Sequence, residues 1–531
     1  MKSEIAEPGQ SELQGSSAYL ASRSMQRDRS LRRSIVKNAS VNLVRLGGSG
    51  IVALLLPPFL VRTLPRDTYS AWALLLQLTL YVGLLDFGIQ TAVARFVAHA
   101  DELNDPEQRD GIASTAVLLL ASAAALGCCF VAVLAWQLPH VFAAMPVDLQ
   151  RGARIALLLM GGSFALGLPF SVVHAVFIGL QRNEVPAAIV IANRFAMAAF
   201  TMGVVFSHWG LAAMGGAVAL ANVISYGGSY FAWRAWASHI NLRISLASKR
   251  YAKEIASYSA ALAIWFAGML MVSGLDLSIV GVFDYTATAY YAVAATLTNF
   301  VAQAQGAIFA ALLPVSAVLN ARGDAQKLGA LLVSSTRYGM LILLAMAVPL
   351  ILGVNLILRV WVGPSYAEHS SLIMQVLVVA NVVRLSALPY ATLLLGTGQQ
   401  RKVIMSPLAE GVTNLLASVL GAYFLGAIGV AIGTLIGSFV GVGLHLFHNM
   451  PRTSAIAVDR SALVRQGLFR PLVCAAPLAL LLLSNVMKPY TSLSAASFFL
   501  GLAIVSTGFL FWNFGLISSE RRKLGDVFRI S

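Results

Sequence analysis

Residues 112–136 read IASTAVLLLASAAALGCCFVAVLAW, an apolar run without a charged side chain. A transmembrane helix needs about 20 mainly apolar residues to cross a hydrocarbon core about 30 Å thick. The rest of the chain has the same character: 58% of the 531 residues are hydrophobic, 11% are charged, and the mean hydropathy is +0.77. Soluble domains carry about 25% charged residues. The sequence therefore predicts an all-α polytopic membrane protein.

Runs of similar length recur along the chain and predict about 14 transmembrane helices. Their approximate bounds are 41–62, 69–92, 112–136, 153–178, 185–206, 210–234, 255–280, 286–318, 333–358, 369–395, 402–424, 427–449, 468–487 and 493–516.

The net charge of +15 follows the predicted topology. With a cytoplasmic N-terminus, 28 of the 37 Lys and Arg residues fall in inner segments, six in outer loops and three inside the spans. This bias is the positive-inside rule, and it predicts that both termini are cytoplasmic. The basic charge therefore orients the chain next to anionic membrane lipids and does not indicate a nucleic-acid partner. Residues 1–35 are predicted to be a disordered basic tail; a specific protein partner for this tail stays open.

Sequence motifs repeat at an offset of 219 residues. Residues 179–182, GLQR, recur as GQQR at 398–401, and residues 209–212, WGLA, recur as IGVA at 428–431. The alternative is chance spacing among similar helices. A duplication of six spans places both halves in the same topology, as in transporters with parallel repeats, and leaves a cleft between them. The predicted units are an N-lobe (36–235), a C-lobe (255–450), spans thirteen and fourteen (466–517) and a basic cytoplasmic tail (518–531).

Six ionisable residues lie within apolar stretches where a membrane protein would normally exclude them: Arg45, Asp86, Arg194, Asp276, Arg384 and Glu410. Each costs roughly 2.5–3.5 kcal/mol at the centre of a spanning helix, so each is expected to face protein or a watery cavity. Arg194, Arg384 and Glu410 lie closest to the predicted midplane. Fixed salt bridges within one lobe are an alternative, as is snorkelling of Arg45 to the membrane surface.

Polar side chains at helical spacing form faces on two of the predicted spans. Asn42 and Arg45 share one face of the first span, and Asn299 and Gln303 share one face of the eighth. We expect these faces to line the cleft; helix–helix hydrogen bonding is the alternative. The sequence contains no Walker loop and no HExxH motif, so it predicts neither an enzyme nor a metal or cofactor site.

The stretch around the second predicted span resembles a known family. Residues 57–62 (PPFLVR), 64–72 (LPRDTYSAW), 86–89 (DFGI) and Arg95 resemble the Wzx-type polysaccharide and O-antigen flippases of the multidrug/oligosaccharidyl-lipid/polysaccharide superfamily. The family pattern has Tyr-Gly where this chain has Tyr69-Ser70. The span count, the repeat and the predicted cytoplasmic termini agree with this family past residue 35.

The resemblance implies transfer of a polyprenyl-diphosphate-linked oligosaccharide across the inner membrane, for exopolysaccharide or O-antigen synthesis. Arg45, Arg194 and Arg384 would bind the diphosphate, with Asn42, Asn299 and Gln303 in the same cavity. Asp86, Asp276 and Glu410 would orient the arginines or carry H⁺ or Na⁺ if transport is coupled. Polysaccharide assembly proteins would be further partners. A multidrug or cation exporter, a lipid II flippase and a membrane glycosyltransferase or polymerase are the alternatives.

Overall fold

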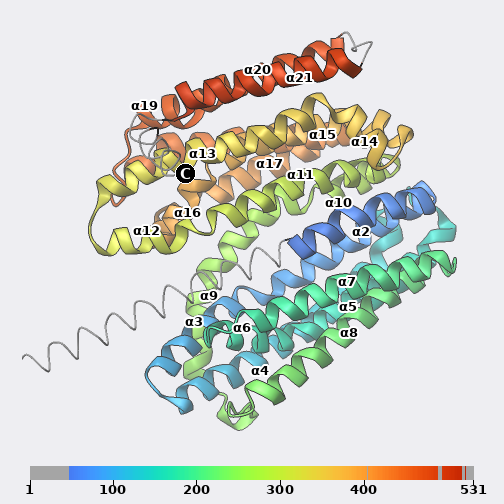
Figure 1. The fold of residues 1–531 in the computed structure, drawn as a ribbon. Helices are drawn as coiled ribbons and strands as arrows, with labels where there is room; N and C mark the ends of the chain where they lie inside the picture. The colour runs from blue at the N-terminus through green and yellow to red at the C-terminus, as the bar shows by residue number, and fades with distance from the viewer. Residues whose placement is uncertain (1–46, 404, 488–492, 517–520, 522–531) are drawn as a thin grey trace, which may run out of the picture.

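The computed structural model describes residues 47–403, 405–487, 493–516 and 521. Throughout these ranges the chain is helical with short connections and contains no strand (Figure 1). Asn42, Arg45, the tail 1–35 and nearly all of the tail 518–531 lie outside the described residues.

Within the described ranges, twelve helices are long and apolar enough to cross a membrane, and two shorter apolar helices, Gly47–Thr63 and Gly501–Gly515, bring the total to the predicted number of about 14. The main elements are α2 (Arg66–Gly83), α3 (Ile89–Glu102), α4 (Pro106–Val141), α5 (Val147–Gly167), α6 (Ser171–Gly179), α7 (Glu184–Phe206), α8 (Gly210–Trp236), α9 (Lys249–Met269), α10 (Asp276–Phe283), α11 (Thr288–Phe309), α12 (Leu312–Ala321), α13 (Ala325–Leu352), α14 (Val354–Trp361), α15 (Pro364–Leu385), α16 (Leu388–Thr397), α17 (Met405–Leu425), α18 (Ala427–Leu444), α19 (Arg460–Ala462), α20 (Arg470–Met487) and α21 (Leu493–Leu510). The fold class predicted from the sequence is confirmed.

Two of the predicted spans, 153–178 and 369–395, contain a break in the helix. The fourth span bends at the 3-10 turn Leu168–Phe170, between α5 and α6. The tenth bends between Leu385 and Leu388, and adding 219 to Leu168 gives position 387. A proline lies at each break, Pro169 and Pro389, and proline removes a helical hydrogen bond. The two halves therefore share their helix breaks as well as their helix order.

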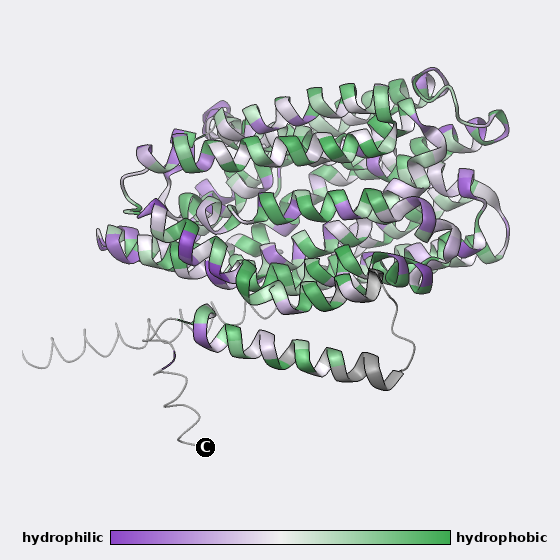
Figure 2. Cartoon of the chain, turned by 90° about the horizontal axis from the view of Figure 1, so that it is seen from above, coloured by the Kyte–Doolittle hydropathy of each residue, from purple (hydrophilic) through white to green (hydrophobic). Residues whose placement is uncertain are grey.

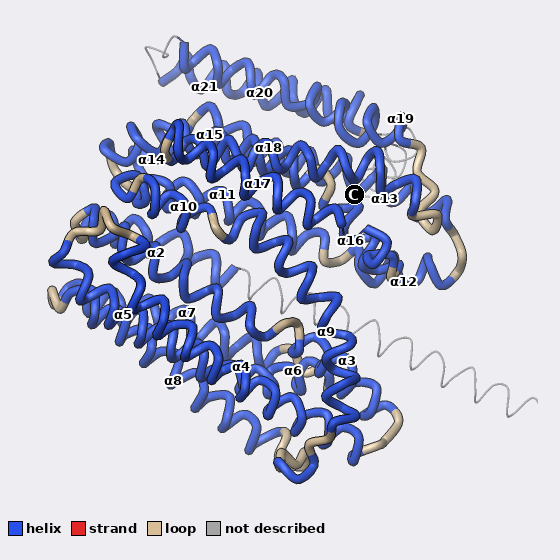
Figure 3. The backbone as a smooth tube through the Cα atoms, turned by 180° about the vertical axis from the view of Figure 1, so that it is seen from behind, coloured by secondary structure: helices blue, strands red, loops and turns tan. Residues whose placement is uncertain are grey.

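The two halves form lobes that are joined at one end (Figures 1 and 3). One cluster of buried apolar side chains extends from Val52 to Ala221 and from Ile279 to Ala431, so both lobes contribute to it. A second cluster, from Ile89 to Ile255, contains neither α11 nor any later helix. Two further clusters begin at Val301 and Leu328 and contain only residues of the second half. We call the shared end the closed end and the other the open end.

Hydrophobic residues cover most of the length of the helices, and hydrophilic residues gather at helix ends and connections (Figure 2). This pattern suits helices whose middles lie in hydrocarbon, where side chains are solvated by lipid rather than water.

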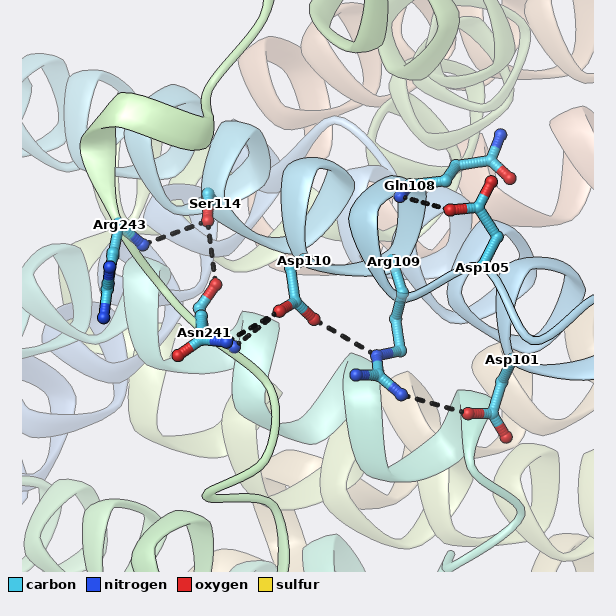
Figure 4. Close-up of polar contacts among 8 residues, drawn as sticks. All are labelled: Asp101, Asp105, Gln108, Arg109, Asp110, Ser114, Asn241 and Arg243. Carbon is cyan, nitrogen blue, oxygen red and sulfur yellow. Dashed lines mark hydrogen bonds and ion pairs between the residues drawn. The ribbon is translucent and has the colours of Figure 1, made fainter.

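The linker between the lobes is fixed to the N-lobe at the open end (Figure 4). Asp110, at the start of α4, accepts hydrogen bonds from the backbone N–H and the side-chain amide of Asn241, at 3.0 and 3.1 Å. Arg109 contacts Asp110 at 3.2 Å and Asp101 at 3.4 Å. The Ser114 hydroxyl accepts from the Arg243 N–H at 3.1 Å. Because these bonds hold the linker, relative movement of the lobes has to occur beyond it, in span seven.

Span seven crosses from one lobe to the other. Its first half, α9, packs against α3 and α4 and also against α17. A π-helical turn, Leu270–Gly274, follows, and α10 then packs against α2, α11, α17 and α18. Two side chains of α2 hold this turn: Gln77 donates to the Gly274 carbonyl at 2.5 Å and the Tyr81 hydroxyl donates to it at 2.7 Å.

Candidate functional site

A cavity of about 230 Å³ lies between the lobes. The helix Gly47–Thr63 and α2 form one wall, and α10, α11, α15 and α18 form the other. Apolar side chains line most of it. Its polar side chains come mainly from the C-lobe: Gln77, Asp276, Tyr291, Thr296, Thr298, Asn299, Asn381, Arg384 and Thr434.

Arg384 lies in the last turn of α15, just before the break in span ten. The C-terminal end of a helix carries partial negative charge and stabilises a cation. The Arg384 Nη2 donates to the Asn381 Oδ1 at 2.6 Å, and the Asn381 amide donates to the Thr298 carbonyl at 3.1 Å. The other terminal nitrogen, Nη1, is buried and has no hydrogen-bond partner among the described residues. The guanidinium is thus held in place with one donor group unused.

Asp276 is the first residue of α10, directly after the break in span seven. A helix N-terminus carries partial positive charge, which stabilises a carboxylate. The Asp276 Oδ2 accepts from the Tyr291 hydroxyl at 3.2 Å and from the Thr434 hydroxyl at 3.0 Å. Oδ1 is buried and has no hydrogen-bond partner among the residues described. Broken helices of this kind place charged groups at the depth of the membrane in transporters.

Glu410 is buried between α17 and α18, with 8% of its surface exposed. Every fourth residue of α17 faces a glycine of α18: a Cβ on Gly433 would lie 2.4 Å from the Ser418 N, one on Gly437 2.7 Å from the Asn414 Cβ, and one on Gly441 2.2 Å from the Glu410 Oε2. The polar face of α17 formed by Glu410, Asn414 and Ser418 therefore packs inside the C-lobe. The Asn414 amide also donates to the Val272 carbonyl at 2.8 Å. The Glu410 Oε1 has no hydrogen-bond partner in the described part of the chain.

Three charged residues of the C-lobe, Asp276, Arg384 and Glu410, interact at a distance. Arg384 lies close enough to Asp276 and to Glu410 to act on both electrostatically. In the described part of the chain, neither acid forms an ion pair with Arg384 within 4.0 Å. Two carboxylates and one guanidinium therefore share a mainly apolar surrounding without neutralising one another directly. Such a group can bind an anion at Arg384 and a cation at the acids.

Contacts between the lobes seal the cavity at the closed end. Arg62 donates to the Val360 carbonyl at 2.8 Å, and the Trp361 indole N–H donates to the Leu54 carbonyl at 2.8 Å. Tyr366 lies between two other tyrosines, with ring centroids 6.5 Å from Tyr69 and 5.1 Å from Tyr290. The two hydrogen bonds and the contact of Tyr366 with Tyr69 join opposite lobes, so they have to break before the cavity can open at this end.

The structure brings three of the predicted site residues to the cavity: Asp276, Asn299 and Arg384. Gln303 is exposed one turn beyond Asn299 on α11 and does not line the cavity. Asp86 accepts from the Gln90 N–H at 3.3 Å, so it caps the start of α3. Arg45 and Asn42 lie outside the described residues.

Arg194 lies on α7 in the N-lobe, away from the cavity lining. Ala187, Ala198, Thr201 and Val205 are buried and share a helical face with it. Arg194 itself is exposed. The helical face that carries Arg194 therefore packs against protein elsewhere along α7.

Some residues of the site carry little signal in the sequence. Thr434 and Tyr291 hold Asp276, but an isolated Thr or Tyr in an apolar span is usually a helix–helix contact. The 219-residue offset does pair Tyr291 with Trp72, and both line the cavity. Arg337, which the six candidate charges do not include, is fully buried in α13. Its position inside the predicted span 333–358 could have identified it as a further buried charge.

The fold is similar to those of solved transporters. An inward-facing multidrug resistance transporter of the MATE family and MOP superfamily matches with a TM-score of 0.66 at 14% identity, over 80% of this chain and 99% of that one. A lipid II flippase, MurJ, in an inward closed conformation matches with a TM-score of 0.67 at 11% identity, over 92% and 99%. An outward-facing MATE transporter gives 0.60 at 12% identity, over 81% and 96%. The chain thus has the fold of MOP-superfamily transporters.

No protein-family model matches the chain, and no curated protein matches it.

Proposed function

We propose that this chain moves a polyprenyl-diphosphate-linked oligosaccharide from the cytoplasmic to the periplasmic leaflet of the inner membrane by alternating access. The observation that carries the proposal is Arg384, a cation with an unused donor group in a cavity between two lobes that are sealed at one end. A guanidinium suits bidentate contacts with phosphate oxygens. The exported oligosaccharide would supply extracellular or surface polysaccharide synthesis.

Other groups of the protein would contact the other parts of the substrate. Asn299 and Thr296 line the cavity beside Arg384 and can bind sugar hydroxyls. Arg194 would contact the anionic substrate from the N-lobe once the lobes rearrange, and Arg45 would act with it. The apolar walls and the surrounding lipid would hold the polyprenyl chain. Transport, rather than bond-breaking chemistry, is therefore the proposed activity.

Asp276 and Glu410 are the proposed carriers of a coupling ion, H⁺ or Na⁺. Each has one carboxylate oxygen without a hydrogen-bond partner in the described chain, and Thr434 supplies a further oxygen at 3.0 Å from Asp276. Oxygen atoms are the ligands that hard cations prefer. Loading of these acids would change the charge beside Arg384 and so its hold on the diphosphate.

We infer that the open end faces the cytoplasm, because the basic linker lies at that end and the positive-inside rule predicts basic segments on the cytoplasmic side. Substrate would thus enter from the cytoplasmic leaflet and leave after the closed end opens. Proteins that synthesise or polymerise the oligosaccharide are the expected partners.

Complementation of a strain lacking its polysaccharide flippase tests the proposal. We expect the wild-type chain to restore surface polysaccharide, Arg384→Gln to abolish it, and Arg384→Lys to restore it in part. The matched control is Arg322→Gln, which neutralises an exposed arginine at the open end. Full activity of Arg384→Gln, at equal protein level, would refute the role of this cavity.

Export of cationic drugs is the second candidate, and the two acids near a single arginine favour it. Under that function, expression in a drug-sensitive strain would raise resistance to cationic compounds, and Asp276→Asn or Glu410→Gln would remove the resistance. Rescue of a strain depleted of its lipid II flippase would instead assign the chain to cell-wall synthesis.

A further inference from the structure

The exposed face of α3 carries charge at the open end of the molecule. Thr91, Arg95 and His99 follow one another at intervals of four residues, and all three are exposed. The opposite face is buried in the N-lobe: Ile89, Ala92, Val93, Val97 and Ala100. Since α3 belongs to a helix apolar enough to cross a membrane, a cation on its exposed face needs a partner or water.

Arg95 is held between α3 and α9. Its guanidinium lies 4.9 Å from the ring centre of Tyr258 and 5.9 Å from that of Phe96. The two helices are in direct contact, because a Cβ on Gly88 would lie 2.9 Å from the Leu262 Cβ. Figures 1 and 3 both show α9 running between the lobes beside α3, at the end where the lobes diverge. Arg95 therefore sits at the mouth of the interlobe space.

Three other arginines of the open end contact acids. Arg109 contacts Asp101 and Asp110, Arg182 contacts Glu184 at 3.8 Å, and Arg250 contacts Glu254 at 3.3 Å. Arg95 forms no ion pair within 4.0 Å in the part of the chain that the structure describes.

Stacking on an aromatic ring orients a guanidinium while its N–H groups stay free in the plane. A guanidinium held in this way is prepared for two parallel hydrogen bonds to a phosphate. The attraction between the guanidinium and the ring also offsets part of the conformational entropy that is lost when a long, exposed side chain is fixed.

We propose that Arg95, stacked on Tyr258, is an entry site for the diphosphate of the lipid-linked substrate, occupied before the substrate reaches Arg384. The inference rests on the proposed function. Leu80 lines the cavity, and Arg95 follows later in the same span, beyond the 3-10 turn Leu84–Asp86 and toward the open end. A lipid whose head group enters at the open end would meet Arg95 first. The phosphate-binding chemistry is shared with ordinary phospholipid head groups, so the test has to separate the two.

The test measures binding of undecaprenyl diphosphate to the purified full chain by native mass spectrometry. Phosphatidylglycerol is titrated in parallel. We expect Arg95→Gln to weaken diphosphate binding about tenfold or more, because a charged hydrogen bond is lost. Arg95→Lys should recover part of the affinity, and Tyr258→Phe, which keeps the ring, should retain it. The control Arg322→Gln, an exposed arginine at the same end, should change binding less than twofold.

Two results would overturn the entry site. One is equal binding by Arg95→Gln and Arg322→Gln. The other is an equal loss of phosphatidylglycerol binding in Arg95→Gln, which would assign the residue to membrane lipid. Failure of the proposed function looks different: the wild-type chain itself would not bind undecaprenyl diphosphate, or Arg384→Gln would still transport. Unchanged melting temperatures of the variants show that each is folded.

Discussion

The glycines of α18 offer a graded test of how the buried polar face of α17 is accommodated. The same substitution, Gly→Ala, meets three different surroundings on one helix. At Gly433 the new Cβ would lie 2.4 Å from the Ser418 N and 2.6 Å from its Cα, which are backbone atoms. At Gly441 it would meet the Glu410 carboxylate at 2.2 Å. At Gly443 nothing lies within 4 Å.

Backbone cannot move aside without separating α17 from α18, whereas a carboxylate can rotate. Overpacking costs typically about 1–3 kcal/mol. The gain in helix propensity from Gly to Ala, about 1 kcal/mol, is common to all three variants and cancels in the comparison. Gly433→Ala should therefore be less stable than Gly443→Ala by about 2–3 kcal/mol or more. Gly441→Ala should lose little stability but displace Glu410.

Unfolding in detergent, followed by tryptophan fluorescence, measures the difference in stability. Transport of the lipid-linked substrate then separates loss of stability from displacement of Glu410. Gly441→Ala should transport poorly although it is folded, and Gly443→Ala should transport normally. Equal stability of Gly433→Ala and Gly443→Ala would refute the close packing of α17 on α18. Normal transport by Gly441→Ala would refute the functional placement of Glu410.

Three further predictions concern the ends of the molecule. Trp361→Phe removes one hydrogen bond between the lobes, worth about 1 kcal/mol. The ratio of molecules with the closed end open to molecules with it shut should therefore rise roughly fivefold, as measured by distances between spin labels on the two lobes. An unchanged distance distribution would contradict this. Asp110→Ala should lower the free energy of unfolding by about 2–3 kcal/mol, because it breaks a buried ion pair and frees the linker. The control Asp105→Ala, which removes only a helix cap, should lower it by about 1 kcal/mol. Equal losses in the two variants would show that Asp110 does not hold the linker. Hydrogen bonds from the Lys327 side chain and N–H lower the pKa of Asp324. The contribution of the Asp324 carboxylate to folding stability should therefore be complete above pH about 4 and vanish as the pH falls through the lowered pKa of the folded state. Asp324→Ala and the wild type should differ in melting temperature at pH 7 and have the same melting temperature in acid.

Hydropathy and repeat spacing were sufficient to predict the architecture. The bilayer requires about 20 apolar residues per span, so the helices between residues 47 and 516 stand out without any knowledge of tertiary contacts. The 219-residue offset predicted the duplication, and the matching breaks near Leu168 and Leu388 agree with it. The breaks themselves were not predicted, because proline in a spanning helix is tolerated in many positions.

The site was predicted less completely, for reasons of packing. A charge in a span indicates a cavity or a partner, and Arg384 and Asp276 meet that expectation. Depth alone could not distinguish Glu410, which packs inside the C-lobe, from residues that line the cavity. Nor could spacing show that Asp86 caps a helix, since this depends on the positive φ of Phe87 and Gly88. Conformation and side-chain packing, rather than composition, decide these roles.

Leaflet-resolved transport by the purified chain tests the central claim most directly. The protein is reconstituted into vesicles that contain a polyprenyl-diphosphate-linked oligosaccharide, and the fraction of substrate exposed on each leaflet is measured over time with a membrane-impermeant sugar-modifying enzyme. The account predicts transfer by the wild type and by Arg322→Gln, and loss of transfer in Arg384→Gln. Transfer by Arg384→Gln at the wild-type rate, or no transfer by the wild type, would contradict it.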